Sequence, residues 1–237
     1  MSECLQAACL RLPLSIRYAR RRALYRPKGA TPWAFIICMK KKIAVLIDGG
    51  HLRVHTRKAH KVFVPDYIEK VAHACALADE EIHRVLFYDC PPYNGSAIQP
   101  VSGTPRNFTG SDAWLHELSR KDLFAVRIGV LKFRGFILKQ SRIPFAAGAP
   151  PLTDADFEPK FEQKGVDMRI GLDMATISSN RSVELIALVT NDTDCIPAMK
   201  NARRAGLQVA LIAVPGYSPA PELLAHSDFR RSIAWPV

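Results

Sequence analysis

The sequence contains no run of about 18 uncharged apolar residues, which is the length that a helix needs to cross a bilayer. No membrane association is therefore expected, and the protein is predicted to be cytoplasmic. Its six cysteines form no C-x-x-C pair and show no zinc-type spacing with histidine. This pattern favours reduced thiols over disulfides or a structural zinc site.

Acidic residues are scarce relative to basic ones, with 22 Asp and Glu against 33 Lys and Arg and a net charge of +11. Such a chain attracts polyanions, most often nucleic acid and less often an acidic membrane surface. The length of 237 residues and the 48% hydrophobic content suit one globular domain with a tail. A homodimer is compatible with these numbers.

The first 38 residues differ from the rest in composition. Residues 1–38 carry seven Lys or Arg and one acidic residue, without a sustained hydrophobic period. Three interpretations fit this segment: a disordered basic tail, an organelle transit peptide, or a start codon assigned too early. We favour the last, because "MKKKIAVLIDGG" from Met39 runs from a short basic lead directly into a first strand. The folded domain is predicted to span residues 39–237.

Strand-like and helix-like segments alternate from Lys42 onward. The predicted strands occupy residues 43–47, 82–88, 124–133, 184–190 and 208–214, and the predicted helices occupy residues 65–78, 111–121, 165–179 and 194–204. A loop is expected at 91–109 and an irregular stretch from 134 to 164. Alternation of this kind predicts an α/β fold, with an open, mainly parallel sheet of about five strands and helices on both faces. Such a fold is a Rossmann-like three-layer sandwich.

Acidic side chains follow two of the predicted strands. Asp48 comes directly after the strand at 43–47, while Asp192 and Asp194 follow the strand at 184–190. Open α/β sheets bind ligands at the carboxyl ends of their strands, near the point where the strand order reverses. We therefore expect these carboxylates to share one cleft.

The predicted helix at 165–179 adds two more acids. On a helical wheel, Asp167 and Asp173 border the apolar stripe, and Asp173 lies about 9 Å further along the axis. Carboxylates that converge on one cleft repel each other unless a cation or shared protons compensate, and their hard oxygens suit Mg²⁺ or Mn²⁺. The predicted metal ligands are Asp48, Asp167, Asp173, Asp192 and Asp194.

Three motifs in order resemble one known family. "IAVLIDGG", "KGVDMRIGLDM" and "LVTNDTDCIPAMKNARRAGLQVALI" are similar to the NYN domain, in particular its LabA-like branch, which belongs with the PIN-like ribonucleases. The resemblance spans roughly residues 41–233 and implies a PIN-like sandwich and a metal-dependent endoribonuclease. The catalytic set that it implies is Asp48, Asp167, Asp192 and Asp194. His51 departs from the pattern, because many members have Asn at that position.

Basic segments and polar residues beside the motifs are candidates for contacts with RNA, which is the expected partner. The predicted substrate-binding residues are His51, Arg53, Arg134, Thr190 and Asn191. Residues 51–61 read as a basic loop, and residues 120–142 hold seven Lys or Arg and one acid. Phe133 and Phe136 interleave with this second run, where they either stack on bases or belong to the core.

Other interpretations of these features stay open. An Asp at the end of a strand is often only a helix cap, and Asp194 is especially open to that explanation. A catalytically inactive member would use the same cleft to bind RNA or a protein partner. A phosphatase of the haloacid dehalogenase type would need an acid two residues after Asp48, where this chain has Gly50. Cys195 lies near a helix N-terminus, where a thiol pKa is often lowered, but it lacks the partner motif of a nucleophile.

Overall fold

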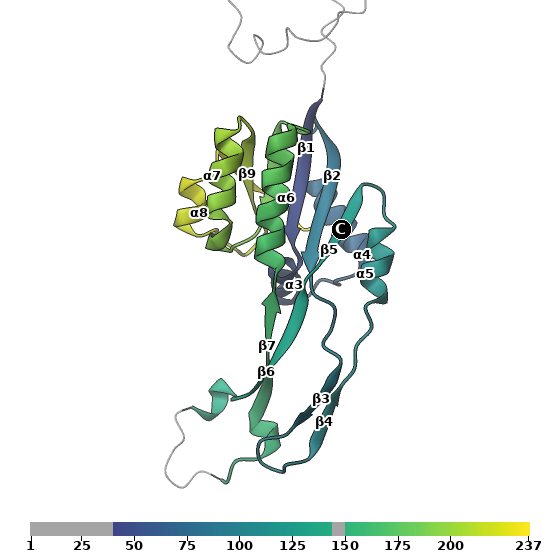
Figure 1. Cartoon of the computed structure of the whole chain (residues 1–237), viewed down its shortest axis with the longest axis vertical. Helices are drawn as coiled ribbons and strands as arrows, with labels where there is room; N and C mark the ends of the chain where they lie inside the picture. The colour runs from purple at the N-terminus through teal and green to yellow at the C-terminus, as the bar shows by residue number, and fades with distance from the viewer. Residues whose placement is uncertain (1–39, 144–149) are drawn as a thin grey trace, which may run out of the picture. The chain divides into compact units, whose positions relative to one another are not determined.

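The computed structural model describes residues 40–143 and 150–237 (Figure 1). The predicted basic tail at 1–38 lies outside these residues. Six strands form one parallel sheet in the order β10-β9-β8-β1-β2-β5. Their bounds are β1 Lys41–Asp48, β2 Glu80–Asp89, β5 Phe124–Ile128, β8 Leu185–Val189, β9 Gln208–Ala213 and β10 Phe229–Ser232.

The central strand β1 is buried on both faces, as its unbroken apolar run predicts. Every residue from Ile43 to Ile47 is at most 1% exposed. Alternate side chains enter two separate cores, with Val45 in one and Leu46 in the other. The sheet is therefore the middle layer of the molecule.

Helices complete the two outer layers. One core is closed by α3 Gly49–Lys58, α4 Pro65–Ala74 and α5 Ala113–Ser119, and the other by α6 Val166–Asn180, α7 Ile196–Arg204 and α8 Pro221–Ala225. Figure 1 shows α6 and α7 side by side over one face of the sheet. This arrangement confirms the predicted α/β sandwich. No helix in the described part of the chain is long and apolar enough to span a membrane.

The strand order reverses between β1 and β8. From β1 the chain adds β2 and then β5 on one side, whereas β8, β9 and β10 extend the sheet on the other side. Ile47 pairs with Val189, so the next residues, Asp48 and Thr190, come side by side at the carboxyl edge. This edge is the place where open α/β sheets bind ligands.

The predicted strand at 124–133 is correct only as far as Ile128, because the chain leaves the sheet at Gly129. Its backbone N–H bonds to the carbonyl oxygen of Asp89 at 2.8 Å, and a Cβ there would lie 2.8 Å from both Cys90 Sγ and the Lys164 carbonyl oxygen. Only glycine fits this close crossing. The chain continues as β6 Val130–Leu138, which pairs antiparallel with β7 Phe157–Lys164. Within the stretch predicted to be irregular, residues 134–138 and 157–164 are thus paired strand.

A second hairpin occupies the predicted loop at 91–109. It consists of β3 Gly95–Ile98 and β4 Pro105–Phe108. A cluster of rings joins the two hairpins, with centroids 5.3–6.4 Å apart. Its members are Tyr93, Phe108, Phe133, Phe136 and Phe161. Phe133 and Phe136 therefore belong to a small core between the hairpins.

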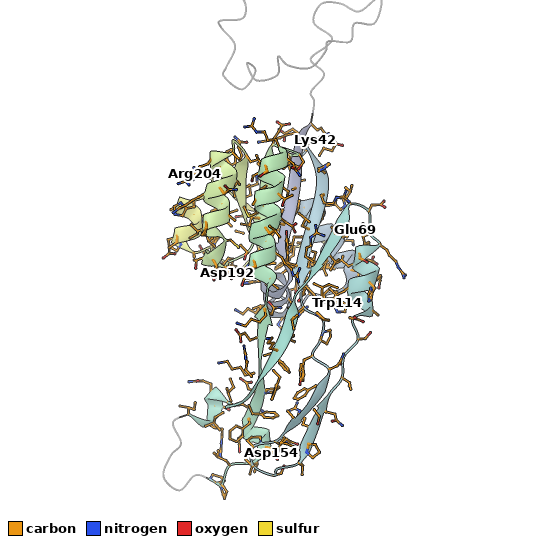
Figure 2. All side chains as sticks on the ribbon, in the orientation of Figure 1. Lys42, Glu69, Trp114, Asp154, Asp192 and Arg204 are labelled. Atoms are coloured by element: carbon orange, nitrogen blue, oxygen red, sulfur yellow. The ribbon has the colours of Figure 1, made fainter. Side chains whose placement is uncertain are left out.

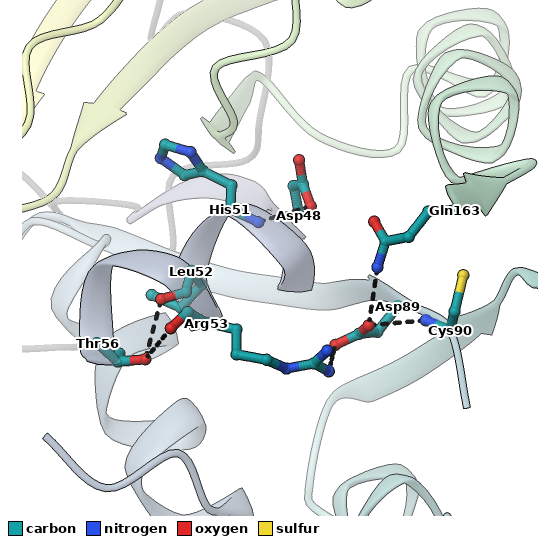
Figure 3. Close-up of polar contacts among 8 residues, drawn as sticks. All are labelled: Asp48, His51, Leu52, Arg53, Thr56, Asp89, Cys90 and Gln163. Atoms are coloured by element: carbon teal, nitrogen blue, oxygen red, sulfur yellow. Dashed lines mark hydrogen bonds and ion pairs between the residues drawn. The ribbon is translucent and has the colours of Figure 1, made fainter. Parts of the chain in front are cut away.

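The segment interpreted as a basic loop begins as a helix, α3. Its N-cap is Asp48, whose side chain accepts a hydrogen bond from the backbone N–H of His51. This helix contains few apolar residues, because little more than Leu52 and Thr56 is buried in it. The Thr56 hydroxyl donates to the Leu52 carbonyl oxygen at 3.0 Å (Figure 3). A polar helix of this kind has no clear hydrophobic period in the sequence.

Candidate active site

Thr190 ties the ends of the two central strands together. Its hydroxyl donates to Asp48 Oδ2 at 3.2 Å and accepts from the backbone N–H of Asp192 at 3.1 Å. The other Asp48 oxygen accepts from the His51 N–H at 3.1 Å. Burial raises the pKa of Asp48, although these hydrogen bonds oppose the shift. The Asp48 carboxylate is therefore held in one orientation at the carboxyl edge.

Asp192, rather than Asp194, is the capping residue after β8. Its Oδ1 accepts from the backbone N–H of Asp194 at 2.8 Å and opens a short 3₁₀ turn, Thr193–Cys195, that leads into α7. Both Asp48 and Asp192 thus act as helix caps, which was the simpler interpretation of each. Capping does not account for Asp167, because the N-cap of α6 is Gly165 and no side chain caps that helix.

Asp167 brings α6 into this acidic cluster. Burial, then the charge and hydrogen bond of Asp192, then the charges of Asp48 and Asp194, raise the pKa of Asp167 to about 6. Carboxylates that raise each other's pKa in this way form the environment that a cation relieves. The structure therefore brings together four of the five predicted acids.

The oxygen donors of this cluster suit Mg²⁺ or Mn²⁺ in their chemistry. Among residues 40–143 and 150–237, however, no group of three or more His, Cys, Asp or Glu side chains has the geometry to hold a metal ion. The Asp48 and Asp192 carboxylates instead accept hydrogen bonds from backbone and side-chain donors.

Asp173, the fifth predicted ligand, lies outside the cluster. Its Oδ2 accepts hydrogen bonds from the Tyr88 hydroxyl at 3.0 Å and from Arg127 Nε at 2.9 Å. One helical turn and a half separates it from Asp167, and that distance turns it toward β2 and β5. Its carboxylate already has a cationic partner in Arg127.

Asp89 at the end of β2 is an acid that the sequence interpretation missed. Its side chain is fully buried and forms an ion pair with Arg53, while the Cys90 N–H donates to Oδ1 at 2.7 Å (Figure 3). Burial raises its pKa against the pull of Arg53, and the charge of Asp48 adds to the rise. The available signal was its position: it ends a strand that neighbours β1.

Two glycines let the acids approach α3. A Cβ at Gly49 would lie 2.5 Å from Asp89 Oδ2, and one at Gly50 would lie 2.8 Å from Gln163 Oε1. Gln163, from β7, donates to Asp89 Oδ1 at 3.4 Å. Side chains at these two positions would push the first turn of α3 away from the carboxylates.

His51 faces a small aromatic group rather than the carboxylates. Its ring lies 4.6 Å from the ring of His55 and 4.8 Å from that of Tyr217, measured between centroids. Burial and then the nearby His55 lower the pKa of His51 to about 4, so the imidazole is neutral at pH 7. Within the described residues, His51 Nε2 and the Tyr217 hydroxyl are buried without a hydrogen-bond partner.

The remaining predicted substrate contacts lie in different places. Arg53 pairs with Asp89 at the edge of the acidic cluster, and Asn191, which is exposed, accepts a hydrogen bond from the Ala220 N–H at 3.3 Å. Arg134 lies on β6 and pairs with Glu162 of β7. The structure therefore places Arg134 on a hairpin and not with the four acids.

Cys195 is buried beside the cluster. Burial, followed by the charges of Asp192 and Asp167, raises the pKa of its thiol to about 12. The lowered pKa considered from the sequence is thus wrong, because neighbouring carboxylates outweigh the helix terminus. The thiol stays protonated at pH 7 and has no nucleophilic character.

Comparison with known proteins identifies the family. A sequence model described as the NYN domain matches residues 107–232, which include Asp167, Asp192 and Asp194. An uncharacterized protein of Methanocaldococcus jannaschii is 37% identical over 70 residues, and the match covers 29% of this chain and 29% of that protein. A crystal structure of a protein of unknown function from Vibrio parahaemolyticus is 19% identical, with a TM-score of 0.47 over 82% of this chain and 94% of that one. The chain belongs to the NYN domain family and thereby to the PIN-like nuclease superfamily.

Proposed function

We propose that this protein is a Mg²⁺- or Mn²⁺-dependent endoribonuclease that hydrolyses RNA phosphodiester bonds at the cluster of Asp48, Asp167, Asp192 and Asp194. The observation that carries the proposal is that Asp48 and Asp192 follow adjacent central strands and are joined through hydrogen bonds to Thr190. Asp167 of α6 lies close enough for their charges to raise its pKa. Four acids from three separate segments meet at the switch point of the sheet, where such folds bind ligands. The order of the sequence motifs supports an assignment to the LabA-like branch.

In this proposal, Asp48, Asp167 and Asp192 hold the cation, and Asp194 supports them. A bound divalent cation supplies positive charge that polarises a phosphoryl oxygen and activates water for attack. Thr190 orients the Asp48 carboxylate, and a bound cation would lower the raised pKa of Asp167. Asp173 is left out of this set, because Arg127 and Tyr88 already occupy its carboxylate.

The direct test is cleavage of single-stranded RNA by the purified full chain with Mn²⁺, with Mg²⁺ and with EDTA. We expect metal-dependent cleavage that Asp192→Asn reduces to background, since the substitution removes a charge from the cluster while keeping its shape. Asp122→Asn is the matched control: Asp122 is exposed beside Leu123, at the amino end of β5, and its loss should leave cleavage unchanged. Gel electrophoresis of end-labelled RNA measures cleavage by both variants and by the wild type.

The alternative is a catalytically inactive module that binds RNA through the same cleft. It would be supported if the wild type bound RNA but released no fragments with either cation. Equal cleavage by the wild type and by Asp192→Asn would instead overturn the assignment of the site.

A further inference from the structure

A pocket of about 530 Å³ lies where the two hairpins meet the α/β sandwich. Tyr93, Phe108 and Phe161 of the hairpin ring cluster contribute one part of its lining, and Phe63 and Trp114 contribute another. Figure 2 shows Trp114 and Asp192 at the same end of the sheet, far from Lys42. Pockets of this size, lined by aromatic side chains and a few polar groups, are typical of small-molecule sites.

Polar groups in the lining are cationic or neutral. The Arg106 guanidinium lies 5.2 Å from the centre of the Phe108 ring, and that of Arg53 lies 5.1 Å and 5.5 Å from the rings of Phe63 and Trp114. Asn107 adds an amide. No described residue that lines the pocket is acidic. The pocket therefore fits a flat, hydrogen-bonding group attached to an anion.

Arg53 links the pocket to Asp89, which ends the strand next to β1. The same guanidinium that lies over the pocket's rings is ion-paired with Asp89, whose pKa the charge of Asp48 helps to raise. Cys90, the next residue along the chain, also lines the pocket. A ligand that spans both places needs a phosphate at one end and a planar group at the other.

The ring cluster also has a purely structural role, because it holds the hairpins together. Tyr93 stacks on Phe133 with an interplanar angle of 25°, and Phe133 contacts Phe136. Phe133 and Phe136 are absent from the pocket lining, however, so they serve that role alone. The open pocket beside Tyr93 and Phe108 is not needed to pack the hairpins.

We propose that this pocket receives one unpaired nucleobase of a single-stranded RNA whose neighbouring phosphodiester lies at the acidic cluster. The identification of the polymer as RNA rests on the function proposed above. Aromatic rings and guanidinium planes are the groups on which unstacked bases pack, and a base held in a duplex cannot enter such a site. The hairpins thereby select single-stranded substrate.

The test compares the affinities of two probes by fluorescence anisotropy. EDTA is present, so that the measurement does not depend on cleavage. The two probes are labelled hexauridylate and a ribose-phosphate hexamer of equal charge without bases. We expect the wild type to bind hexauridylate roughly 5- to 100-fold more tightly, as stacking of a base on aromatic side chains predicts. Thr109→Leu, which places a larger, non-aromatic side chain at an exposed position of the pocket lining, should bring this ratio closer to one.

Arg106→Ala is the second variant, and it should also reduce the ratio. Arg230→Ala is its matched control, because it removes the same charge from β10 at the opposite edge of the sheet from β5. That control should weaken the binding of both probes equally and leave the ratio of their affinities unchanged. A ratio that neither Thr109→Leu nor Arg106→Ala changes, in variants whose circular dichroism matches the wild type, would overturn the pocket assignment.

The two proposals fail in different ways. Base-dependent binding without metal-dependent cleavage would support the proposed base pocket and contradict the proposed nuclease activity. Metal-dependent cleavage by a protein that binds both hexamers equally would support the proposed nuclease activity and contradict the proposed base pocket.

Discussion

The parallel sheet and the two hairpins are stabilised in different ways. In the sheet, whole strands are buried on both faces, and β1 and β8 have no exposed residue between Ile43 and Ile47 or between Leu185 and Val189. In the hairpins, exposed and half-buried residues alternate along β6, and five rings supply most of the packing. The sheet is thus a scaffold, whereas the hairpins are a locally packed addition beside the candidate active site.

The largest effect should come from breaking the sheet. Leu46→Ala removes a fully buried side chain from the central strand, and we expect it to lower the free energy of unfolding by about 3 kcal/mol through lost burial and the cavity left behind. Urea denaturation followed by circular dichroism measures this. Leu172→Ala on the exposed side of α6 is the control and should cost less than about 0.5 kcal/mol. Equal losses would mean that the sheet is not the scaffold.

An intermediate effect should follow from breaking the hairpins. Phe133→Ala takes away a half-buried ring with four aromatic neighbours, and we expect a local loss of about 2 kcal/mol. Hydrogen exchange followed by mass spectrometry should show faster exchange in β6 and β7 and unchanged exchange in β1 and β8. Exposed Lys132 provides the control Lys132→Ala on the same strand. Faster exchange throughout β1 would contradict the separation of the two regions.

The smallest effect concerns the acids at the boundary between the regions. The folded-state pKa of Asp167, about 6, lies above its ordinary value of 3.8, so the folded chain binds more protons than the unfolded chain between these pH values. Stability should therefore fall as pH rises from about 4 to 6, by less than about 1 kcal/mol for this partly solvated group. Asp167→Asn should flatten this part of the profile in thermal melts.

Asp122→Asn is again the control, and its profile should keep the slope of the wild type. An Asp167→Asn profile as steep as that of the wild type would show that the acidic cluster does not set this dependence. Added Mn²⁺ should raise the melting temperature of the wild type more than that of Asp167→Asn, because a cation bound only by the folded chain stabilises it.

The sequence predicts the sheet well, because burial on both faces leaves unbroken apolar runs such as Ile43–Ile47. The hairpins were not predicted: their strands are short and polar on one side, and the rings that hold them lie far apart in the sequence. Helix α3 was missed for a related reason, since its polar surface has no hydrophobic period and its start is fixed by the Asp48 cap.

The candidate site was predictable where position alone decides it. Asp48 and Asp192 follow adjacent strands, so their proximity follows from the topology. Asp173 and Arg134 were grouped with them by helix geometry or by composition, and the ion pairs with Arg127 and Glu162 depend on side-chain packing that a sequence does not display. Asp89 required knowledge of strand order, which places β2 next to β1.

The hydrogen bond between Thr190 and Asp48 joins residues that are 142 positions apart. During synthesis from the amino end, β1 therefore waits for most of the chain to emerge before it can pair with β8. Until then, one side of β1 offers an unpaired hydrophobic edge, which is a hazard for association with other chains. The acidic cluster is completed only when this pairing forms, so an unfinished chain has no assembled site.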